Sequence, residues 1–364
     1  MVGGPRGSGK TTLVERYRAA REDPPRVLDD VRPGGDALRE IAALAGADPR
    51  PGRLLISGSA RFPALAETLG ARLAVLELWP LSMAERTGAA GDFVAAAFGD
   101  PAELSASSDW TRERYLDCVA AGGFPGLPPG AQAGARGAWY EGYLDSLLGE
   151  VIPQVATIYN DEAMRRLIGV IADRAGAPLS VMDLSINAGL ARPTVRRYLA
   201  HLENAYLTIR IPSWRSDLKL VKSPKLYPAD SGLAAHLLHA DAAYLGSPRR
   251  RGTAPLLATF AAGELVKALA VTGSAVTLSH LRNFDLTDVD FVLEEPGGKV
   301  VGITLAAEEP GARAFKGLRW LRGRIGSRLH AGIVLHLGTE ASSHGDGSYA
   351  LPLSVLWGHR ALPR

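Results

Sequence analysis

Residues 4–11, GPRGSGKT, could bind the phosphates of a nucleotide. They fit the phosphate-loop pattern G-x-x-x-x-G-K-[ST] without a mismatch, and glycines let backbone N–H groups turn inward around phosphate oxygens. Lys10 is expected to reach the β- and γ-phosphates, and the Thr11 hydroxyl to bind Mg²⁺. The alternative is a glycine-rich surface turn, but KTTLVERYRAA follows as a helix whose positive end faces the anion. The predicted ATP-binding residues are Gly4, Gly7, Ser8, Gly9, Lys10, Thr11 and Thr12.

A carboxylate for the metal is predicted at the end of the next apolar strand, RVLDDV. A phosphate-loop enzyme needs such an acid beside its loop to hold Mg²⁺. Asp29 is therefore predicted as a metal ligand with Thr11, and Asp30 as the water-activating acid. A plain strand-to-loop turn would also explain both aspartates. A second buried strand follows at residues 54–57, where Ser57 or Ser59 could sense the γ-phosphate or simply make a turn.

The composition is that of a globular protein, with 46% apolar and 22% charged residues. The 364 residues suffice for two or three domains. A single cysteine, Cys118, excludes an internal disulfide and fits a reducing compartment. With no signal peptide and no uninterrupted apolar span of about 20 residues, we expect a cytoplasmic protein without a membrane segment. The net charge of +3 is small, but basic residues cluster in RPTVRR, KLVKSPK and PRRRG.

A helix-turn-helix with a following strand is predicted in the middle of the chain. The pattern gives a helix from about 180 to 187, a turn at Gly189, a helix from 192 to about 203 and a strand at 207–211. Duplex DNA is a candidate partner, because the basic start of the second helix could meet phosphates or base edges. The alternative is a helical pair that packs against the rest of the protein. The candidate DNA-binding residues are Arg192, Arg196 and Arg197.

Several of these stretches together resemble a prokaryotic family of AAA-type ATPases. The resemblance rests on GPRGSGKTT, VLDD, LLISGSARF, LGAR, GGFP, VRRYLAHLENAYL, KSPKLYPADSGLAAHLL and VDFVLE. That family carries a carboxy-terminal domain of unknown function, number 4143. The resemblance implies an ATPase in which Asp30 replaces a family glutamate. Arg72 of LGAR matches a family arginine, a candidate catalytic charge stabiliser in cis or in trans.

The resemblance also implies an α/β fold in three parts. Residues 1–120 would form the P-loop ATPase domain, 121–240 a helical, winged-helix-like domain, and 241–364 a small α/β domain like the restriction-endonuclease core. Family members have a longer strand before the loop, and a further strand and helix between Thr12 and Val27. A parallel sheet without them would leave an edge exposed. We therefore expect either a start upstream of Met1 or an eroded ATPase domain.

The nuclease-like part lacks the side chains that hydrolysis needs. In that fold an aspartate ends one strand and Glu-x-Lys lies on the next, where they bind metal and activate water. Asp290 fits the first position, but Thr304 and Ala306 replace the other two, and Ala258 stands where an upstream acid is typical. Nuclease activity is therefore not expected. Asp288 and Asp290 are predicted to face solvent from an edge strand.

Two functions remain open at this stage. The leading hypothesis is an ATP- and Mg²⁺-binding AAA-type ATPase, a possible homo-oligomer, whose later domains meet a partner such as duplex DNA. The alternative is a nucleotide- or DNA-binding regulator without turnover, which the short scaffold and Asp30 favour. A small-molecule kinase ranks last, because the interval before Val27 has no room for a lid.

Overall fold

The computed structural model describes residues 1–104, 107–128, 130–154, 160–241, 245, 253–285 and 287–358. The chain forms two compact units, each built from separate stretches of sequence. The first contains residues 1–81, 124–167 and 185–208, and the second contains 82–123, 168–184 and 209–364. Each unit is described by itself. The basic PRRRG stretch at 248–252 lies outside the described residues.

A four-stranded parallel sheet is the centre of the first unit. The strands β1 (Val2–Gly3), β2 (Arg26–Leu28), β3 (Leu54–Gly58) and β4 (Leu76–Glu77) lie in the order β2-β3-β1-β4. Helices α2 (Gly35–Ala47) and α3 (Pro63–Leu69) pack against each other, and α1 (Lys10–Ala19) contacts β3. Although β1 has only two residues, Val2 pairs with both Ser57 and Leu76. The edge strand β4 leaves Leu76 49% exposed.

The core of this sheet follows from the apolar periodicity of its elements. Ile56 on β3, Ile41 on α2 and Leu65 on α3 are at most 2% exposed and belong to one cluster. Further along the chain, α7 (Ala133–Ser146) continues into a π-helical turn, Leu147–Val151, and a short 3₁₀ helix, Ile152–Gln154. These helices supply the aromatic residues discussed below.

The predicted helix, turn, helix and strand are all present in the middle of the chain. After α8 (Asp161–Asp173), they are α9 (Val181–Ala188), a turn in which Gly189 has a φ of 66°, α10 (Arg192–Asn204) and β5 (Thr208–Ile211). Helix α10 starts with Arg192 and Pro193, and proline suits the first turn because its missing N–H has no partner there. Its buried residues recur at helical spacing: Val195, Tyr198, Leu199 and Leu202.

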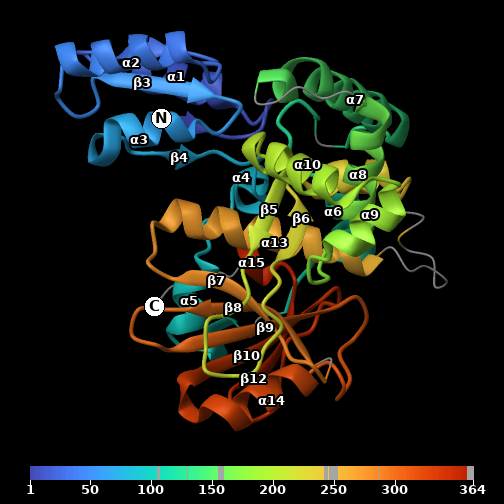
Figure 1. Ribbon diagram of the computed structural model, residues 1–364. Coiled ribbons are helices and arrows are strands. Elements are labelled where there is room, and N and C mark those ends of the chain that lie inside the picture. The colour runs from blue at the N-terminus through green and yellow to red at the C-terminus, as the bar shows by residue number, and fades with distance from the viewer. Residues whose placement is uncertain are drawn as a thin grey trace. The chain divides into compact units, whose positions relative to one another are not determined.

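A six-stranded mixed sheet is the centre of the second unit. Its order is β11-β12-β10-β9-β8-β7, with β9 parallel to β10 and antiparallel to β8. The strands are β7 (Thr277–Arg282), β8 (Asp288–Glu294), β9 (Val300–Ala306), β10 (Leu329–His336), β11 (Ser342–Ser343) and β12 (Ser348–Pro352). Helices α13 (Thr253–Thr272) and α14 (Lys316–Ile325) lie on opposite faces of this sheet (Figure 1).

Shorter elements complete the second unit. A two-stranded sheet pairs β5 with β6 (Lys225–Pro228), and α11 (Ser231–Leu237) follows directly. The remaining helices are α4 (Met83–Thr87), α5 (Phe93–Phe98), α6 (Arg112–Ala121) and α15 (Val355–Gly358). Short 3₁₀ helices lie at Gly70–Arg72 in the first unit and at Pro101–Leu104 and Gly326–Arg328 in the second.

Helix α13 is long and apolar enough, by length and composition, to cross a membrane. Within the described residues it is the single helix that meets this test, and 56% of its apolar window is buried inside the protein. It contacts α11, β6 and β9 of its own unit. The contacts are those of a core helix.

The sequence-based prediction that Asp288 and Asp290 lie on an edge strand is wrong. Their strand, β8, pairs with β7 on one side and β9 on the other, so it is an interior strand of the sheet. The prediction failed because residues 277–282 form β7, which was not identified as a strand in the sequence. Both aspartate side chains are partly buried on this strand, at 30% and 25% exposed.

Candidate nucleotide-binding site

The loop between β1 and α1 has the backbone shape that its glycines allow. Gly7 and Gly9 have φ values of 76° and 94°, in the left-handed region that glycine adopts without strain. Gly4 has a different constraint, because a Cβ there would overlap the carbonyl oxygen of Leu78. The loop therefore depends on glycine for two separate reasons, backbone conformation and close packing.

Lys10 is buried inside this loop. Its side chain is 6% exposed, and Nζ donates to the carbonyl oxygens of Gly4 (3.0 Å) and Pro5 (2.8 Å). Burial lowers the pKa of Lys10 to about 8, although the nearby charges of Asp30 and Asp29 act to raise it. A phosphate would supply the anion that this desolvated ammonium lacks.

Two more features of the loop fit a phosphate. The Ser8 hydroxyl is buried and has no hydrogen-bond partner among the described residues. No side chain caps the amino terminus of α1 at Gly9, so its first N–H groups remain available to an anion. An unpaired buried hydroxyl normally costs stability, and a phosphate oxygen would satisfy it.

Thr11 and Asp29 meet beside the loop. Thr11 Oγ1 donates to Asp29 Oδ2 at 2.9 Å, and Ser57 Oγ donates to Asp29 Oδ1. The strands are parallel, so the carboxyl ends of β2 and β3 lie on the same side of the sheet as the carboxyl end of β1, where the loop starts. This explains the meeting of Thr11 with Asp29. Hydroxyl and carboxylate oxygens suit Mg²⁺, so these residues fit the metal that a nucleoside triphosphate carries. Thr11 and Asp29 would hold it.

Asp30 is fixed by the same group of side chains. Its N–H donates to Ser57 Oγ at 2.9 Å, and its Oδ1 accepts from Ser59 Oγ at 3.3 Å. Its φ of 49° lies in the left-handed region, which aspartate tolerates better than most residues. The two serines suggested as phosphate sensors therefore contact the two predicted acids directly.

The other predicted residues are exposed, and among the described residues no side-chain hydrogen bond or ion pair joins them to the loop. Arg72 is exposed at the end of the 3₁₀ helix Gly70–Arg72, and makes no hydrogen bond or ion pair within the described part of the chain. Thr12 is exposed on α1. Arg192, Arg196 and Arg197 are exposed on the first turns of α10. The roles suggested for these four arginines stay predictions.

Sequence reasoning missed three contacts around the loop. Arg6 Nη1 forms an ion pair with Glu150 at 2.8 Å. The Phe124 ring lies over Gly7 and the Pro125 ring over Gly9, each near 4 Å from the position a Cβ would take. Phe124 also packs against Trp139 and Tyr143, with ring centroids 5.3 and 4.7 Å away. The sequence signal for the Phe124 and Pro125 contacts was the GGFP stretch, which had been interpreted only as one of the stretches that resemble the family.

The lowered pKa of Lys10 gives a pH prediction. In the nucleotide-free protein Lys10 loses its proton near pH 8, and a bound phosphate stabilises the ammonium and raises its pKa. Binding is therefore expected to take up protons between about pH 8 and 9, with affinity falling as the pH rises through this window. Because the folded pKa is below the unfolded value, Lys10 also makes the free protein more stable as pH rises from 8 toward 10.5.

Titration calorimetry with ATP in buffers of different ionisation enthalpy measures this proton uptake. The matched control is Lys10→Met, for which uptake should disappear. Equal proton uptake by the wild type and Lys10→Met would show that another group titrates on binding.

A second charged cluster lies in the other unit, on β6 and β8. Lys225 is fully buried, and its Nζ donates to both carboxylate oxygens of Asp288 (3.1 and 3.2 Å) and to Asp290 Oδ1 (3.3 Å). Asp290 Oδ2 also accepts the N–H of Leu305 at 2.9 Å. The expectation of solvent-facing aspartates is therefore wrong, because a lysine from β6 neutralises them inside the sheet. Burial raises the pKa of Asp288, and the charge of Lys225 opposes this shift.

The nuclease positions on β9 do not join this cluster as metal ligands. Thr304 Oγ1 donates to the carbonyl oxygen of Ala314 at 3.3 Å, and Ala306 carries no functional group. Tyr227 is buried beside the cluster, and its pKa is raised by burial and by the charges of Asp290 and Asp288. Throughout the described ranges, no group of three His, Cys, Asp or Glu residues could hold a metal ion.

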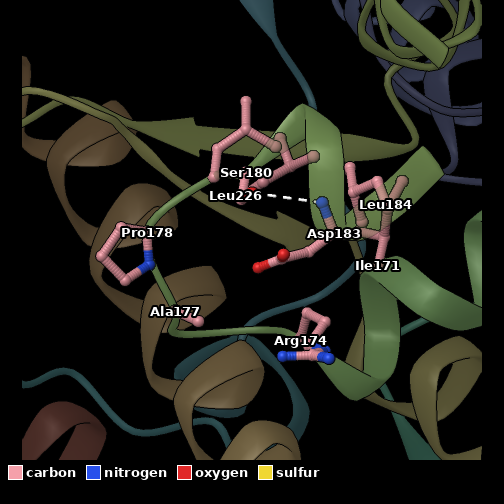
Figure 2. A pocket seen from close by; sticks show the side chains of 9 residues that line it. Ile171, Arg174, Ala177, Pro178, Ser180, Asp183, Leu184 and Leu226 are labelled. Atoms are coloured by element: carbon pink, nitrogen blue, oxygen red, sulfur yellow. Dashed lines mark hydrogen bonds between the residues drawn. The ribbon is translucent and has the colours of Figure 1, made fainter. Parts of the chain in front are cut away.

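A small pocket in the second unit is unsuited to a nucleotide. It is lined by Arg174 after α8, by Asp183 and Leu184 on α9, and by Leu226 on β6, with the Asp183 carboxylate pointing into it (Figure 2). Asp183 is held by its N–H bond to Ser180 Oγ at 3.2 Å. The volume of 30 Å³ has room for one or two water molecules.

Comparisons with known proteins support one part of the expected protein class, namely the carboxy-terminal domain of unknown function. Residues 255–356 match the family described as "Domain of unknown function (DUF4143)", and residues 112–244 match "Domain of unknown function (DUF8612)". The chain is thus an α/β protein with a DUF4143 domain at its carboxy-terminal end. Neither matched range includes the phosphate-binding loop, so the ATPase class is a proposal.

Two mycobacterial proteins are similar to the chain. They are "Uncharacterized protein Rv2008c" of Mycobacterium tuberculosis and "Uncharacterized protein Mb2031c" of Mycobacterium bovis. Each is 28% identical over 277 residues, which cover 66% of this chain and 56% of the relative. The chain therefore spans little more than half the length of these relatives. No solved structure matches it significantly.

Proposed function

We propose that the chain binds ATP with Mg²⁺ at the loop Gly4–Thr11 and hydrolyses it as an AAA-type ATPase. The bond between Thr11 and Asp29 at 2.9 Å, beside the buried Lys10, carries this proposal. It joins a loop hydroxyl to the acid after β2, a parallel strand of the same sheet that β3 separates from β1, and a Mg²⁺–nucleotide site requires such a pairing. Bound Mg²⁺ would neutralise charge on the transferring phosphoryl group.

Each residue near the loop has a defined role in this proposal. Lys10 and the uncapped N–H groups of α1 bind phosphate oxygens. Asp29 is oriented by Ser57, and Asp30, held by Ser59, orients the attacking water. Arg72 acts as a charge stabiliser supplied by a neighbouring copy of the chain, since it is exposed and makes no bond in its own described chain.

The second candidate is a protein that binds ATP without turning it over. Two observations on Asp30 favour it, namely the left-handed φ of 49° and the bond that ties its carboxylate to Ser59. An aspartate is also one methylene shorter than glutamate. The two candidates share the ATP site and differ in the role of Asp30.

Variants of Asp30 separate the two candidates. If Asp30 orients the water, Asp30→Ala should lower kcat by about 10²–10⁴-fold while leaving ATP affinity nearly unchanged. Turnover by phosphate release and affinity with a fluorescent ATP analogue measure the two quantities, with Asp36→Ala on α2 as the exposed control. Binding without turnover in the wild type would favour the non-hydrolysing candidate, and absence of binding would contradict both.

The parts of the chain outside the ATP site are proposed to engage a partner. Duplex DNA is the candidate for α10, because Arg192, Arg196 and Arg197 are exposed on one end of that helix. Exchange of arginine for glutamine at these positions, followed by DNA titration, tests this role separately from ATP.

A further inference from the structure

Helix α14 and its flanks carry an unusual concentration of positive charge. Residues 310–339 contain no aspartate or glutamate, although the whole chain has 41 basic and 38 acidic residues. The basic residues of this stretch are Arg313, Lys316, Arg319, Arg322, Arg324 and Arg328. Three of them are exposed on the helix itself and form the α14 basic face: Lys316, Arg319 and Arg324.

The α14 basic face has no acidic partner. None of its three side chains forms an ion pair within the described residues. Arg319 Nη2 donates to the carbonyl oxygen of Ala312 at 2.7 Å, and the Arg324 guanidinium lies 5.4 Å from the centre of the Trp320 ring. Neither contact neutralises the positive charge of the arginine, because a carbonyl oxygen and an aromatic ring carry no formal negative charge. By contrast, Arg328, just beyond the helix, pairs with Glu294 at 2.9 Å.

The helix dipole favours Arg324 in the last turn of α14, but it does not explain Lys316 and Arg319. Lys316 is the first residue of α14 and Arg319 lies one turn later, where the helix dipole disfavours cations. The first turn has no acidic residue to offset them. Gly323, also exposed, has no atom within 4 Å of the place where its side chain would be. A mid-helix glycine costs about 0.5–1 kcal/mol, and here it leaves the surface between Arg319 and Arg324 open to close approach.

The opposite face of α14 limits which polyanion can bind. Leu318 and Leu321 are at most 1% exposed, and Leu318 packs against Gly302 and Gly332 of the sheet. The apolar side therefore cannot insert into a bilayer, as an amphipathic membrane helix must. From Lys316 to Arg324 the helix rises about 12 Å at 1.5 Å per residue, which equals the width of the major groove of B-DNA. Arginine also binds phosphate with two parallel hydrogen bonds.

We propose that the α14 basic face binds the phosphate backbone of duplex DNA and spans the major groove, with Lys316 and Arg319 at one side of the groove and Arg324 at the other. This surface is separate from the ATP site and from the arginines of α10. It does not depend on ATP binding or turnover.

The test is a fluorescence-anisotropy titration of nucleotide-free protein with labelled duplex DNA over a range of salt concentrations. The triple variant K316Q/R319Q/R324Q should bind at least tenfold more weakly than wild type. Its salt slope should fall by about 2–3, since each lost phosphate contact removes about 0.9. The matched control is R16Q/R18Q/R21Q, which removes three exposed arginines on and just after α1 and should retain the salt slope of the wild type. Because all six side chains are exposed, both variants should unfold at the wild-type temperature.

Each other outcome overturns the proposal. An unchanged affinity and slope in the α14 variant would show that its charges face solvent only. A loss of DNA binding confined to the variant R192Q/R196Q/R197Q would place the DNA surface on α10. If the wild-type protein does not bind duplex DNA at low salt but binds vesicles containing phosphatidylserine, the α14 basic face is a membrane-binding surface instead.

Discussion

Replacing Lys225 by methionine is expected to lower the free energy of unfolding by about 3 kcal/mol. The change removes the buried lysine that bonds to both Asp288 and Asp290, and leaves Arg282, 3.8 Å from Asp288, as the nearby cation among the described residues. The two aspartate side chains are 30% and 25% exposed, so the loss belongs at the lower end of the range for a broken buried pair. Urea denaturation followed by circular dichroism measures it.

The pH dependence separates this explanation from a simple packing loss. Without Lys225 the Asp288 carboxyl loses the positive charge that opposes the effect of burial, so its folded pKa rises further above the unfolded value. The deficit in stability should therefore shrink as the pH falls toward about 5. Lys222→Met is the exposed control and should change stability by less than about 0.5 kcal/mol. A deficit that is independent of pH would contradict the assigned role of the two aspartates.

Replacing Asp29 by asparagine is expected to weaken Mg²⁺ binding to the ATP complex by roughly 10- to 100-fold. Asp29 is the carboxylate that Thr11 and Ser57 both contact, and an amide removes its charge while keeping its shape. The Mg²⁺ concentration giving half-maximal turnover, or half-maximal binding of an ATP analogue, should rise accordingly.

The control for Asp29→Asn is Asp36→Asn, which changes an exposed aspartate on α2. High Mg²⁺ should restore much of the activity of Asp29→Asn, since the phosphate-binding residues are intact. An identical Mg²⁺ requirement in wild type and Asp29→Asn would remove Asp29 from the site.

The local chemistry of the loop could be predicted from the sequence. A fixed spacing of glycines, Lys10 and Thr11 determines the backbone shape and the helix that follows. The meeting of Thr11 with Asp29 was also predictable, because all strands of a parallel sheet have their carboxyl ends on the same side, although β3 separates β2 from β1. The helix-turn-helix elements followed from apolar periodicity and from Gly189.

Long-range pairing is what the sequence could not reveal. Lys225 lies 63 residues before Asp288 along the chain, and no periodicity connects them. The nuclease pattern places its lysine on β9, whereas in the structure the lysine that bonds to Asp290 comes from β6. The mistaken edge position of β8 has the same origin, since strand order depends on tertiary contacts. The contact of Phe124 with the loop, more than 100 residues away, was hidden for this reason too.

The most direct test of the account is Mg²⁺-dependent ATP hydrolysis by this chain, with and without duplex DNA, beside Lys10→Ala. The buried ammonium of Lys10 is expected to stabilise charge on the transferring phosphoryl group, so its loss should reduce turnover by about 10²–10³-fold. The account predicts turnover by the wild type that Lys10→Ala abolishes. Absence of turnover and of ATP binding in a folded wild-type protein, or turnover unchanged in Lys10→Ala, would contradict it.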